Sequence, residues 1–187
     1  MKSKKINPNA LLSKEWIMES FFDMLAVKPL SSITISEIAE NAKVDRRTFY
    51  RHFKTKEDVI TYYIHMVSKQ YEEIVFQNTI NDSYSFAKAI FETCLSMKEI
   101  LQILYKQNLL DLYLDNFEII YKNYQYRNIK PELLMMENID YILSYDRGGV
   151  TNIVKKWITE GCIISPENMT KIIMQLFVLI KDTLKPI

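Results

Sequence analysis

Residues 33 to 56 constrain the fold most strongly, because they contain two short helical patterns separated by a turn. Thr34 begins the first pattern and is followed three residues later by a glutamate, which is the spacing of a capping box. The second pattern begins at Asp45, a favourable N-cap residue, and places Phe49 and Phe53 one helical turn apart. Two aromatic rings on one side of so short a helix need a hydrophobic core. We therefore expect a small helical domain around this segment.

The second helical pattern carries most of the clustered positive charge. Residues 43 to 56 contain six lysines and arginines and one aspartate, which gives a local charge of +5. On a helical wheel, Arg47, Thr48 and Arg51 lie opposite the two phenylalanines. Arginine can bond guanine through two hydrogen bonds, while lysines and hydroxyls hold phosphates, so this face suits the major groove of DNA. The alternative is a solvated charged face on a small helical domain.

Both patterns resemble the N-terminal helix-turn-helix of the tetracycline-repressor-like (TetR/AcrR) family of bacterial transcription regulators. The resemblance is carried by Thr-Ile-Ser-Glu-Ile-Ala at residues 34–39, by Val44, by Thr-Phe-Tyr-Arg-His-Phe at residues 48–53, and by Lys-Thr-Lys-Glu at residues 54–57. It covers about residues 10 to 60. The rest of the chain is similar to the family in layout alone.

The resemblance implies contacts between these two helices and a double-stranded DNA operator. Base-edge contacts are implied for Arg46, Arg47, Thr48 and Tyr50, and phosphate contacts for Thr34, Ser36, His52 and Lys56. The helical wheel adds Arg51 as a DNA-facing residue, with Lys43 and Lys54 as nearby backbone contacts. The wheel places Tyr50 at the side of this face, whereas the family pattern makes it central. Lys43 departs from the family pattern, because glycine is common there and a left-handed backbone costs a lysine about 1 kcal/mol.

The composition favours an all-α fold. The chain has 187 residues, 48% of them hydrophobic, with only three glycines and five prolines. Residues 1–60 contain 11 Lys/Arg and 8 Asp/Glu, while the remaining residues contain 13 and 15, so a basic head precedes a slightly acidic body. Together with the family resemblance, this implies a three-helix DNA-binding domain over residues 1–54. The resemblance further implies a long helix that links it to a helical effector-binding and dimerisation domain over residues 55–187.

The periodicity of apolar residues predicts the individual helices. We expect the first helix to run from about Asn9 to Val27, with Leu12, Trp16, Phe21, Phe22 and Leu25 on its apolar side. The linking helix should be capped by Thr55 and end near Gln77. Further helices are expected over residues 83–96, 98–107 and 109–123, then from residue 139 to Gly161 and from Pro166 onward, with a polar connection over residues 123–130.

The body is rich in aromatic residues that could line a pocket. By resemblance to the family, a small-molecule effector of unknown identity would bind between the linking helix and its neighbours. The candidate ligand-binding residues are Tyr63, Phe86, Phe91, Tyr105, Tyr113, Phe117 and Tyr141. Ordinary packing in the core is the alternative for each of them.

Two apolar stripes near the C-terminus suggest a homodimer, because two long amphipathic helices per chain can build a four-helix bundle. The candidate interface residues are Gly149, Val150, Ile153, Trp157, Ile172, Leu176, Phe177 and Ile180. The alternative is that both stripes face the body's own core. A single small head buries too little DNA for tight specific binding, which favours the dimer. Gly148 and Gly149 predict a kink or a close helix approach in the first stripe.

Catalytic and metal-binding patterns are missing from the sequence. It has two histidines, no Glu-x-x-His pair, no glycine-rich phosphate loop and no nucleophile elbow, so we expect neither an enzyme nor a cofactor or metal site. Cys94 and Cys162 have no metal-ligand spacing and predict buried reduced thiols. Without an apolar leader or membrane-length stretch, we expect a cytoplasmic protein with no membrane partner.

Together these features predict a homodimeric repressor that a small effector releases from a palindromic operator. A helical adapter protein, or a regulator controlled by a protein partner instead of a small molecule, is the alternative. Within the family, residues 46–50, 157–161 and 165–167 are similar to regulators related to those of dihydroxyacetone kinase operons. That similarity does not name an effector.

Overall fold

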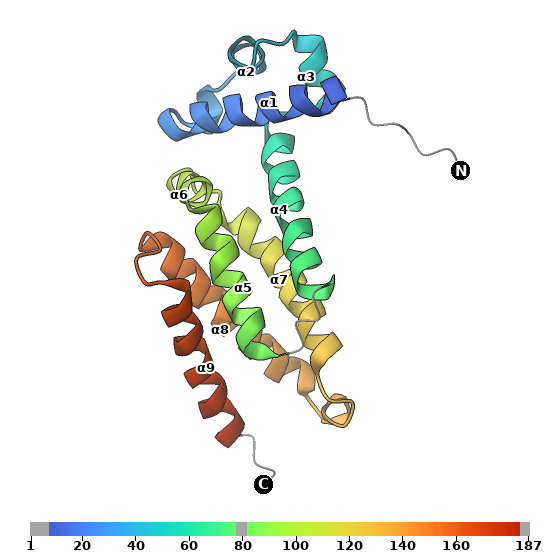
Figure 1. The fold of residues 1–187 in the computed structure, drawn as a ribbon, viewed down its shortest axis with the longest axis vertical. Coiled ribbons are helices and arrows are strands. Elements are labelled where there is room, and N and C mark those ends of the chain that lie inside the picture. The colour runs from blue at the N-terminus through green and yellow to red at the C-terminus, as the bar shows by residue number, and fades with distance from the viewer. Residues whose placement is uncertain (1–7, 78–81, 184–187) are drawn as a thin grey trace, which may run out of the picture. The chain divides into compact units, whose positions relative to one another are not determined.

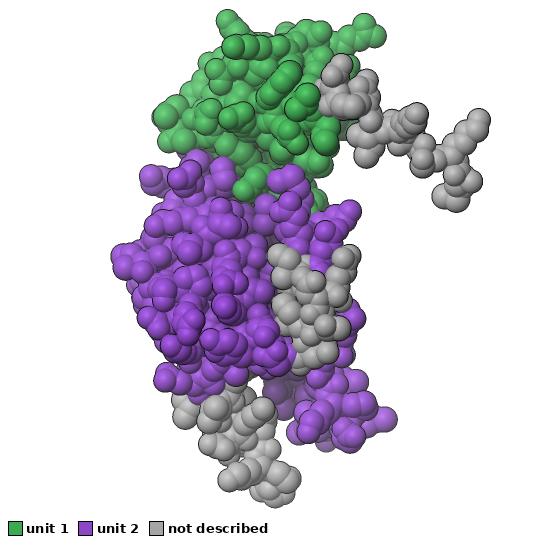
Figure 2. Space-filling view, in the orientation of Figure 1, with its two compact units in different colours: residues 1–65 green, residues 66–187 purple. Residues whose placement is uncertain are grey.

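The computed structural model describes residues 8–77 and 82–183, and these residues form helices and no strands (Figure 1). The all-α class predicted from the sequence is confirmed. Their contacts define two compact units, residues 1–65 and 66–187 (Figure 2). The elements are α1 (Pro8–Val27), η1 (Leu30–Ser32), α2 (Ile35–Asn41), α3 (Arg46–His52), α4 (Glu57–Gln77), α5 (Ser83–Ser96), α6 (Lys98–Lys106), α7 (Leu110–Asn128), η2 (Leu133–Met135), α8 (Ile139–Thr159) and α9 (Pro166–Thr183).

The first unit is a head in which α1 packs against α2 and α3, and α2 packs against α3. Ile17 and Phe21 of α1 are fully buried in its core. The predicted apolar side of α1 is confirmed for Phe21, Phe22 and Leu25, which are buried, and was wrong at two positions. Leu12 and Trp16 are 43% and 47% exposed, whereas the next residues along the helix, Ser13 and Ile17, are buried in their place.

Helix α4 begins in the head and continues into the second unit. The Thr55 hydroxyl accepts a hydrogen bond from the Asp58 backbone N–H at 3.2 Å, and the Asp58 carboxylate accepts one from the Thr55 N–H at 3.0 Å. This reciprocal cap confirms the start predicted from the sequence. Val59 and Ile60 are buried, so the first turns of α4 complete the core of the head. The head unit consequently extends to His65, whereas the predicted domain limit at residue 54 coincides with the end of the helix-turn-helix.

In the second unit, α5 packs against α9, α7 packs against α8, and α6 contacts α5, α7 and α8. The predicted polar connection over residues 123–130 was wrong, because α7 continues to Asn128. Two side chains of that segment are buried. The ring of Tyr124 stacks on Phe86 with centroids 3.5 Å apart, and the amide of Gln125 donates to the Leu143 carbonyl at 3.1 Å. Contacts with α5 and α8 thus extend a helix that its own polar sequence did not predict.

Helix α8 runs without a break through Gly148 and Gly149. A Cβ atom at either position would have no heavy atom of the described residues within 4 Å, apart from its own helix and chain neighbours, so no close helix approach among the described residues requires these glycines. Gly161 ends this segment as predicted, with a φ of +84° that glycine adopts without steric cost. After it, α9 begins at Pro166, as the proline at a first helical position indicated.

Candidate nucleic-acid interface

Helix α2 starts with the capping box that the sequence predicted. The Thr34 hydroxyl accepts a hydrogen bond from the Glu37 N–H at 3.2 Å, and the Glu37 carboxylate accepts one from the Thr34 N–H at 2.9 Å. Lys28 Nζ lies 2.6 Å from the same carboxylate. The hydrogen bond from Lys28, followed by those from Thr34, lowers the pKa of Glu37 to about 2. The first helix of the pair is therefore fixed at its start by both hydrogen bonds and charge.

The turn between α2 and α3 is a Schellman motif centred on Lys43. Lys43 has a φ of +54°, the left-handed conformation expected at this position. Its N–H donates to the Glu40 carbonyl at 3.0 Å, and the Val44 N–H donates to the Ala39 carbonyl at 2.9 Å. Lys43 is strained in this backbone conformation because it is not glycine. Its side chain places an exposed cation beside α3.

Helix α3 is fixed in the head by a cap at its N-terminus and by the packing of its phenylalanine face. The Asp45 carboxylate accepts a hydrogen bond from the Thr48 N–H at 2.5 Å, which together with the Thr48 hydroxyl lowers the pKa of Asp45. Phe49 is fully buried and Phe53 nearly so, with ring centroids 5.8 Å apart. Phe53 also contacts Tyr62 of α4 edge-on at 5.7 Å. These contacts determine which face of α3 is left for a partner.

The face of α3 opposite the phenylalanines is exposed and cationic. The exposed predicted DNA-contact residues are Thr34, Ser36, Lys43, Arg46, Arg47, Tyr50, Arg51 and Lys54. No ion pair within the described ranges involves any cation of this set, although Arg47 and Arg51 lie close enough to Asp45 to help lower its pKa. An anionic partner would therefore meet these cations without first breaking an ion pair. Tyr50 is 48% exposed, consistent with a ring that reaches outward from the side of this face.

His52 and Thr48 are only half-exposed. His52 Nε2 lies 2.9 Å from the hydroxyl oxygen of Ser13 in α1. Burial, followed by the charges of Arg51 and Lys14, lowers the pKa of His52, so the imidazole is neutral at pH 7. A neutral His52 hydrogen-bonded to α1 helps to hold α3 in the head, in addition to any contact with phosphate.

Lys56 differs most from its predicted role. Its ammonium donates to the backbone carbonyls of Leu30 at 2.5 Å and Ile33 at 2.8 Å. These carbonyls belong to η1 and the residue that follows it, so Lys56 ties this turn to the start of α4. The geometry argues against the predicted phosphate contact, because the charge is directed at carbonyls within the head. Sequence spacing could not reveal this, since the bonds join residues more than twenty positions apart.

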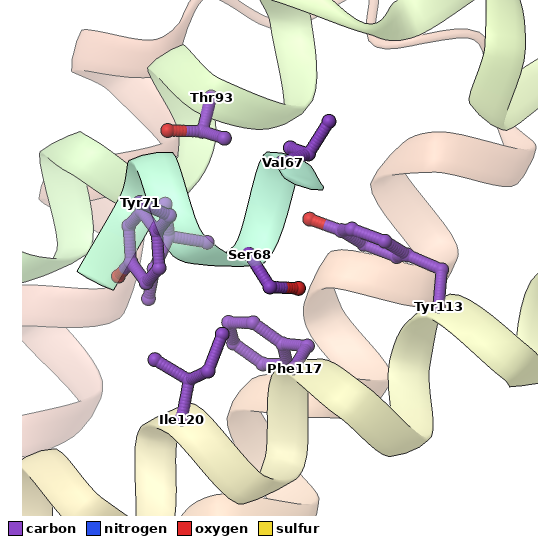
Figure 3. A pocket seen from close by; sticks show the side chains of 8 residues that line it. Val67, Ser68, Tyr71, Thr93, Tyr113, Phe117 and Ile120 are labelled. Atoms are coloured by element: carbon purple, nitrogen blue, oxygen red, sulfur yellow. The ribbon is translucent and has the colours of Figure 1, made fainter. Parts of the chain in front are cut away.

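The second unit contains a hollow between α4, α5 and α7 (Figure 3). Its enclosed space is about 10 Å³, enough for about one water molecule. In Figure 3 the hydroxyl-bearing side chains of Ser68 and Tyr113 point from opposite sides toward the space between them. The lining consists of Val67, Ser68, Tyr71, Ile90, Thr93, Tyr113, Phe117 and Ile120.

Two of the seven predicted ligand-binding residues, Tyr113 and Phe117, line this hollow. The remaining predictions do not fit its geometry. Phe86 and Phe91 are buried in core packing, Tyr63 packs against Phe22 in the head, and Tyr105 and Tyr141 are exposed. The lining residues that the sequence missed are three aliphatic residues, a serine, a threonine and Tyr71. Nothing in a helical pattern separates a side chain facing a hollow from one facing a filled core.

Two family models match the chain. One, described as "Bacterial regulatory proteins, tetR family", matches residues 17–62 and so includes the whole helix-turn-helix. The other, described as "Transcriptional regulator C-terminal region", matches residues 81–178, more than half of the chain. The chain belongs to the TetR family of bacterial regulatory proteins. This confirms the resemblance seen in the sequence and identifies the chain as a transcriptional regulator with a DNA-binding domain.

Relatives and solved structures agree with the TetR-family assignment. The uncharacterized HTH-type transcriptional regulator YxbF of Bacillus subtilis (strain 168) is 32% identical over 83 residues, which are 44% of this chain and 21% of YxbF. The matched segment therefore spans about a fifth of that relative. Lin0861 from Listeria innocua has a TM-score of 0.71 at 14% identity over 96% of each chain. The dihydroxyacetone kinase operon activator DhaS has a TM-score of 0.65 at 16% identity, over 94% of this chain and 99% of DhaS. These likenesses show a shared fold.

Two of the predicted dimer residues of this TetR-family chain lie in its own core. Val150 and Trp157 are buried. The Trp157 ring contacts Phe91 edge-on at 5.1 Å, and its indole N–H donates to the Ile164 carbonyl at 2.9 Å. For these two residues the alternative interpretation, packing within the chain, describes the geometry. The apolar stripe of α8 is occupied by contacts with neighbouring helices.

The other predicted dimer residues are more accessible. Gly149 is exposed, Ile153 is half-buried, and Ile172 and Leu176 of α9 are 38% and 39% exposed. The side chains of Phe177 and Ile180 lie outside the described residues. An apolar surface on α9 thus remains after the chain has formed its own core.

Neither a membrane span nor a metal cluster is present in the described part of this TetR-family chain. Between residues 8 and 183, leaving out 78–81, no helix has the length and apolar character needed to cross a membrane. Over the same ranges, His, Cys, Asp and Glu side chains do not gather in threes where a metal ion could bind. Cys94 is fully buried, and burial raises its pKa to about 12, so its thiol is protonated at neutral pH.

Proposed function

We propose that the chain is a homodimeric, sequence-specific repressor that acts in the cytoplasm, binds a palindromic operator, and leaves it when a small effector binds. The observation that carries the DNA-binding part is the division of α3 into two faces. Phe49 and Phe53 anchor one face in the head, while Arg46, Arg47 and Arg51 are exposed on the other without ion-pair partners among the described residues. A rigid cationic helix of this kind can enter the major groove.

Within this proposal the exposed residues divide between base reading and backbone contact. Arg46, Arg47 and Tyr50 lie in the first turns of α3, the part of a recognition helix that contacts base edges. Lys43 and Lys54 flank the helix and supply charge to the phosphates. Loss of one bidentate arginine–guanine contact should weaken binding by about 1–3 kcal/mol.

The dimer supplies the second recognition helix. Ile172 and Leu176 of α9 are exposed large apolar residues, and Ile163 and Ile164 before α9 are 85% and 41% exposed. Burying such side chains against a second copy is favourable at about 25 cal/mol per Å² of apolar surface. Two copies related by a two-fold axis would match two operator half-sites at least one helical turn apart.

Effector control would act through α4. The first turns of α4 complete the core of the head, and Val67, Ser68 and Tyr71 on the same helix line the hollow. A ligand in the hollow therefore contacts the element that carries the helix-turn-helix. Release needs only a higher ligand affinity for the DNA-incompetent state, and each 1.4 kcal/mol of preference is worth about tenfold in DNA affinity.

Selection of bound duplexes from random DNA, followed by footprinting, tests the proposal. We expect an inverted repeat with two protected half-sites, and loss of the selected binding in Arg47→Ala. Lys88→Ala, which removes a half-exposed cation of α5 that pairs with Glu92 at 3.6 Å, is the control and should bind normally. A chain that prefers no duplex over competitor DNA at low salt, with or without added metabolites, would refute the proposal.

One surface favours a second candidate, a regulator or helical adapter controlled by a protein partner. The segment at η2 exposes four consecutive large apolar residues, Leu133, Leu134, Met135 and Met136, with Met135 89% exposed. Apolar side chains gathered in this way often mark protein contacts. A gel shift with the selected operator tests the adapter, because an adapter that has kept the helix-turn-helix only as structure would not shift it. A regulator controlled by a protein partner would shift the operator, and small metabolites would not release it.

A further inference from the structure

We infer that the outward face of α7 is a second self-association surface, on which α7 of another copy of this chain packs in the antiparallel direction. It is a different surface from the one on α9 that the proposed dimer uses. Two observations carry it: an exposed apolar stripe along α7, and polar side chains beside the stripe that become complementary when the helix is paired with itself.

Three apolar side chains recur at intervals of seven residues along the outward face of α7. Leu112, Ile119 and Tyr126 are exposed, and Ile119 is 60% exposed, whereas Phe117 and Tyr121 on the opposite face are buried. Seven residues are nearly two helical turns, so the three side chains form a stripe with about 10.5 Å between neighbours. Single exposed apolar residues are common on protein surfaces, but a stripe of this period is typical of helices that pair along their length.

Neighbouring side chains hold one end of the stripe in place. The Tyr126 hydroxyl donates a hydrogen bond to the Asp140 carboxylate of α8, and Lys122 Nζ lies 5.9 Å from the centroid of the Tyr126 ring. A ring that is already restrained loses little conformational entropy when a partner covers it. Tyr126 is therefore an exposed apolar surface that is prepared for contact.

The polar residues on the two edges of the stripe determine the direction of pairing. On a helical wheel centred on Ile119, one edge carries Asp115 and Lys122, which form no ion pair with a described residue. The other edge carries Asn116 and Asn123. In an antiparallel pair, equivalent edges of the two helices meet. Asp115 then faces Lys122 of the second copy, and the asparagines face each other.

A two-fold axis at Ile119 brings all of these pairs together at once. Asp115 lies four residues before Ile119 and Lys122 lies three residues after it, so reversal of the helix places each opposite the other to within one residue. The two asparagines lie three residues before and four after, and the ends of the apolar stripe lie seven before and seven after. Every contact is therefore made twice, as an isologous interface requires. In a parallel pair the charged edge would meet the asparagine edge, and no ion pair would form.

The interface is small, because one stripe of three apolar residues per copy buries less surface than a permanent dimer does. We therefore expect a reversible association with a dissociation constant on the order of 10–100 μM. If the α9 surface also pairs, the α7 contact joins two dimers into a tetramer.

Sedimentation equilibrium of the full-length chain without DNA, over concentrations that bracket this constant, tests the surface. Ile119→Glu places two carboxylates at the two-fold axis and should weaken the α7 association at least about tenfold, so the variant stops one doubling short of the native chain. Leu95→Glu, which changes an exposed apolar residue of α5, is the matched control and should associate like the native chain. Circular dichroism confirms that each variant is folded.

Charge reversal tests the antiparallel direction. Asp115→Lys and Lys122→Asp each place like charges opposite one another when the variant pairs with itself, so each alone should associate at least about fivefold more weakly than the native chain. An equimolar mixture of the two variants offers a lysine to an aspartate at both charged contacts. The mixture should therefore associate within about threefold of the native chain. Recovery between two different chains cannot arise from a purely structural role of these side chains within one chain.

Three results would overturn the assignment of α7: a native mass distribution that Ile119→Glu leaves unchanged, an equal loss in Leu95→Glu, or no recovery in the mixture of charge variants. Leu176→Glu, which changes the α9 surface, separates the two interfaces, because it should remove the proposed dimer and leave the α7 step. A chain in which Ile119→Glu removes a step and Leu176→Glu removes none would keep the α7 surface and refute the α9 part of the proposed function. The reverse result would keep the α9 dimer and refute the α7 surface.

Discussion

Replacing Lys56 by alanine should destabilise the head and leave DNA contacts nearly unchanged. The ammonium of Lys56 donates to two carbonyls, Leu30 O at 2.5 Å and Ile33 O at 2.8 Å. Hydrogen bonds to charged groups contribute about 1.5–3 kcal/mol each, but Lys56 is partly exposed and water can replace it at the carbonyls. We therefore expect a loss of about 2 kcal/mol in the free energy of unfolding for both bonds together.

Urea denaturation followed by circular dichroism measures this loss, and amide hydrogen exchange across α2 and α3 assigns it to the head. Lys54→Ala is a close control, because Lys54 is an exposed lysine two positions away whose side chain makes no ion pair with a described residue. We expect this control to keep the stability within about 0.5 kcal/mol and to lower the salt dependence of DNA binding by about one unit. If Lys56→Ala keeps full stability and shows the shallower salt dependence instead, the reasoning is wrong and Lys56 contacts phosphate.

Three further predictions follow from the helix-turn-helix. Hydrogen bonds lower the folded-state pKa of Glu37 to about 2. The contribution of Glu37 to stability is therefore present above pH 4.5, its ordinary pKa, and is lost as the pH falls toward 2. Thermal unfolding measured against pH should show this loss in the native chain and not in Glu37→Gln. Lys43→Gly should relieve the strain of the left-handed backbone and raise the free energy of unfolding by up to about 1 kcal/mol, as measured by urea titration. The same variant should bind DNA more weakly in a gel shift, because it loses an exposed cation. A drop in stability would contradict the prediction. Arg47→Ala and Arg51→Ala should each cost about 1–3 kcal/mol of operator affinity per lost base contact and relax specificity at one position, whereas an equal loss on every duplex would indicate a phosphate contact.

Local features of the fold were predictable because their causes lie within a few residues. Thr34 and Asp45 form the expected caps, Lys43 adopts the expected left-handed turn, and Gly161 ends its segment, each through hydrogen bonds or backbone preferences that short spacing reveals. The exposed cations of α3 followed from the same helical geometry once Phe49 was placed inward.

The features that were missed depend on contacts between distant segments. Helix α7 extends through Tyr124 because that ring stacks on Phe86 of α5, nearly forty positions earlier in the chain. Lys56 points at carbonyls of η1, and Ser68 becomes a lining residue only because α5 and α7 leave a gap beside it. The pattern of polar and apolar residues along a helix is the same whether a side chain contacts a neighbouring helix, a hollow or a backbone carbonyl. The sequence alone therefore could not predict these contacts.

The continuity of α4 limits how this protein could be recombined with its relatives. A chimaera joined after residue 54 would take Val59, Ile60 and Ile64 from the donor of the body, and these buried side chains would have to fit a foreign head. A junction after His65 would keep the native packing of the head. One residue inserted there would still turn everything downstream by about 100° and shift it by about 1.5 Å along the helix. Engineered sensors built from this chain therefore need junctions inside the helix with its length preserved.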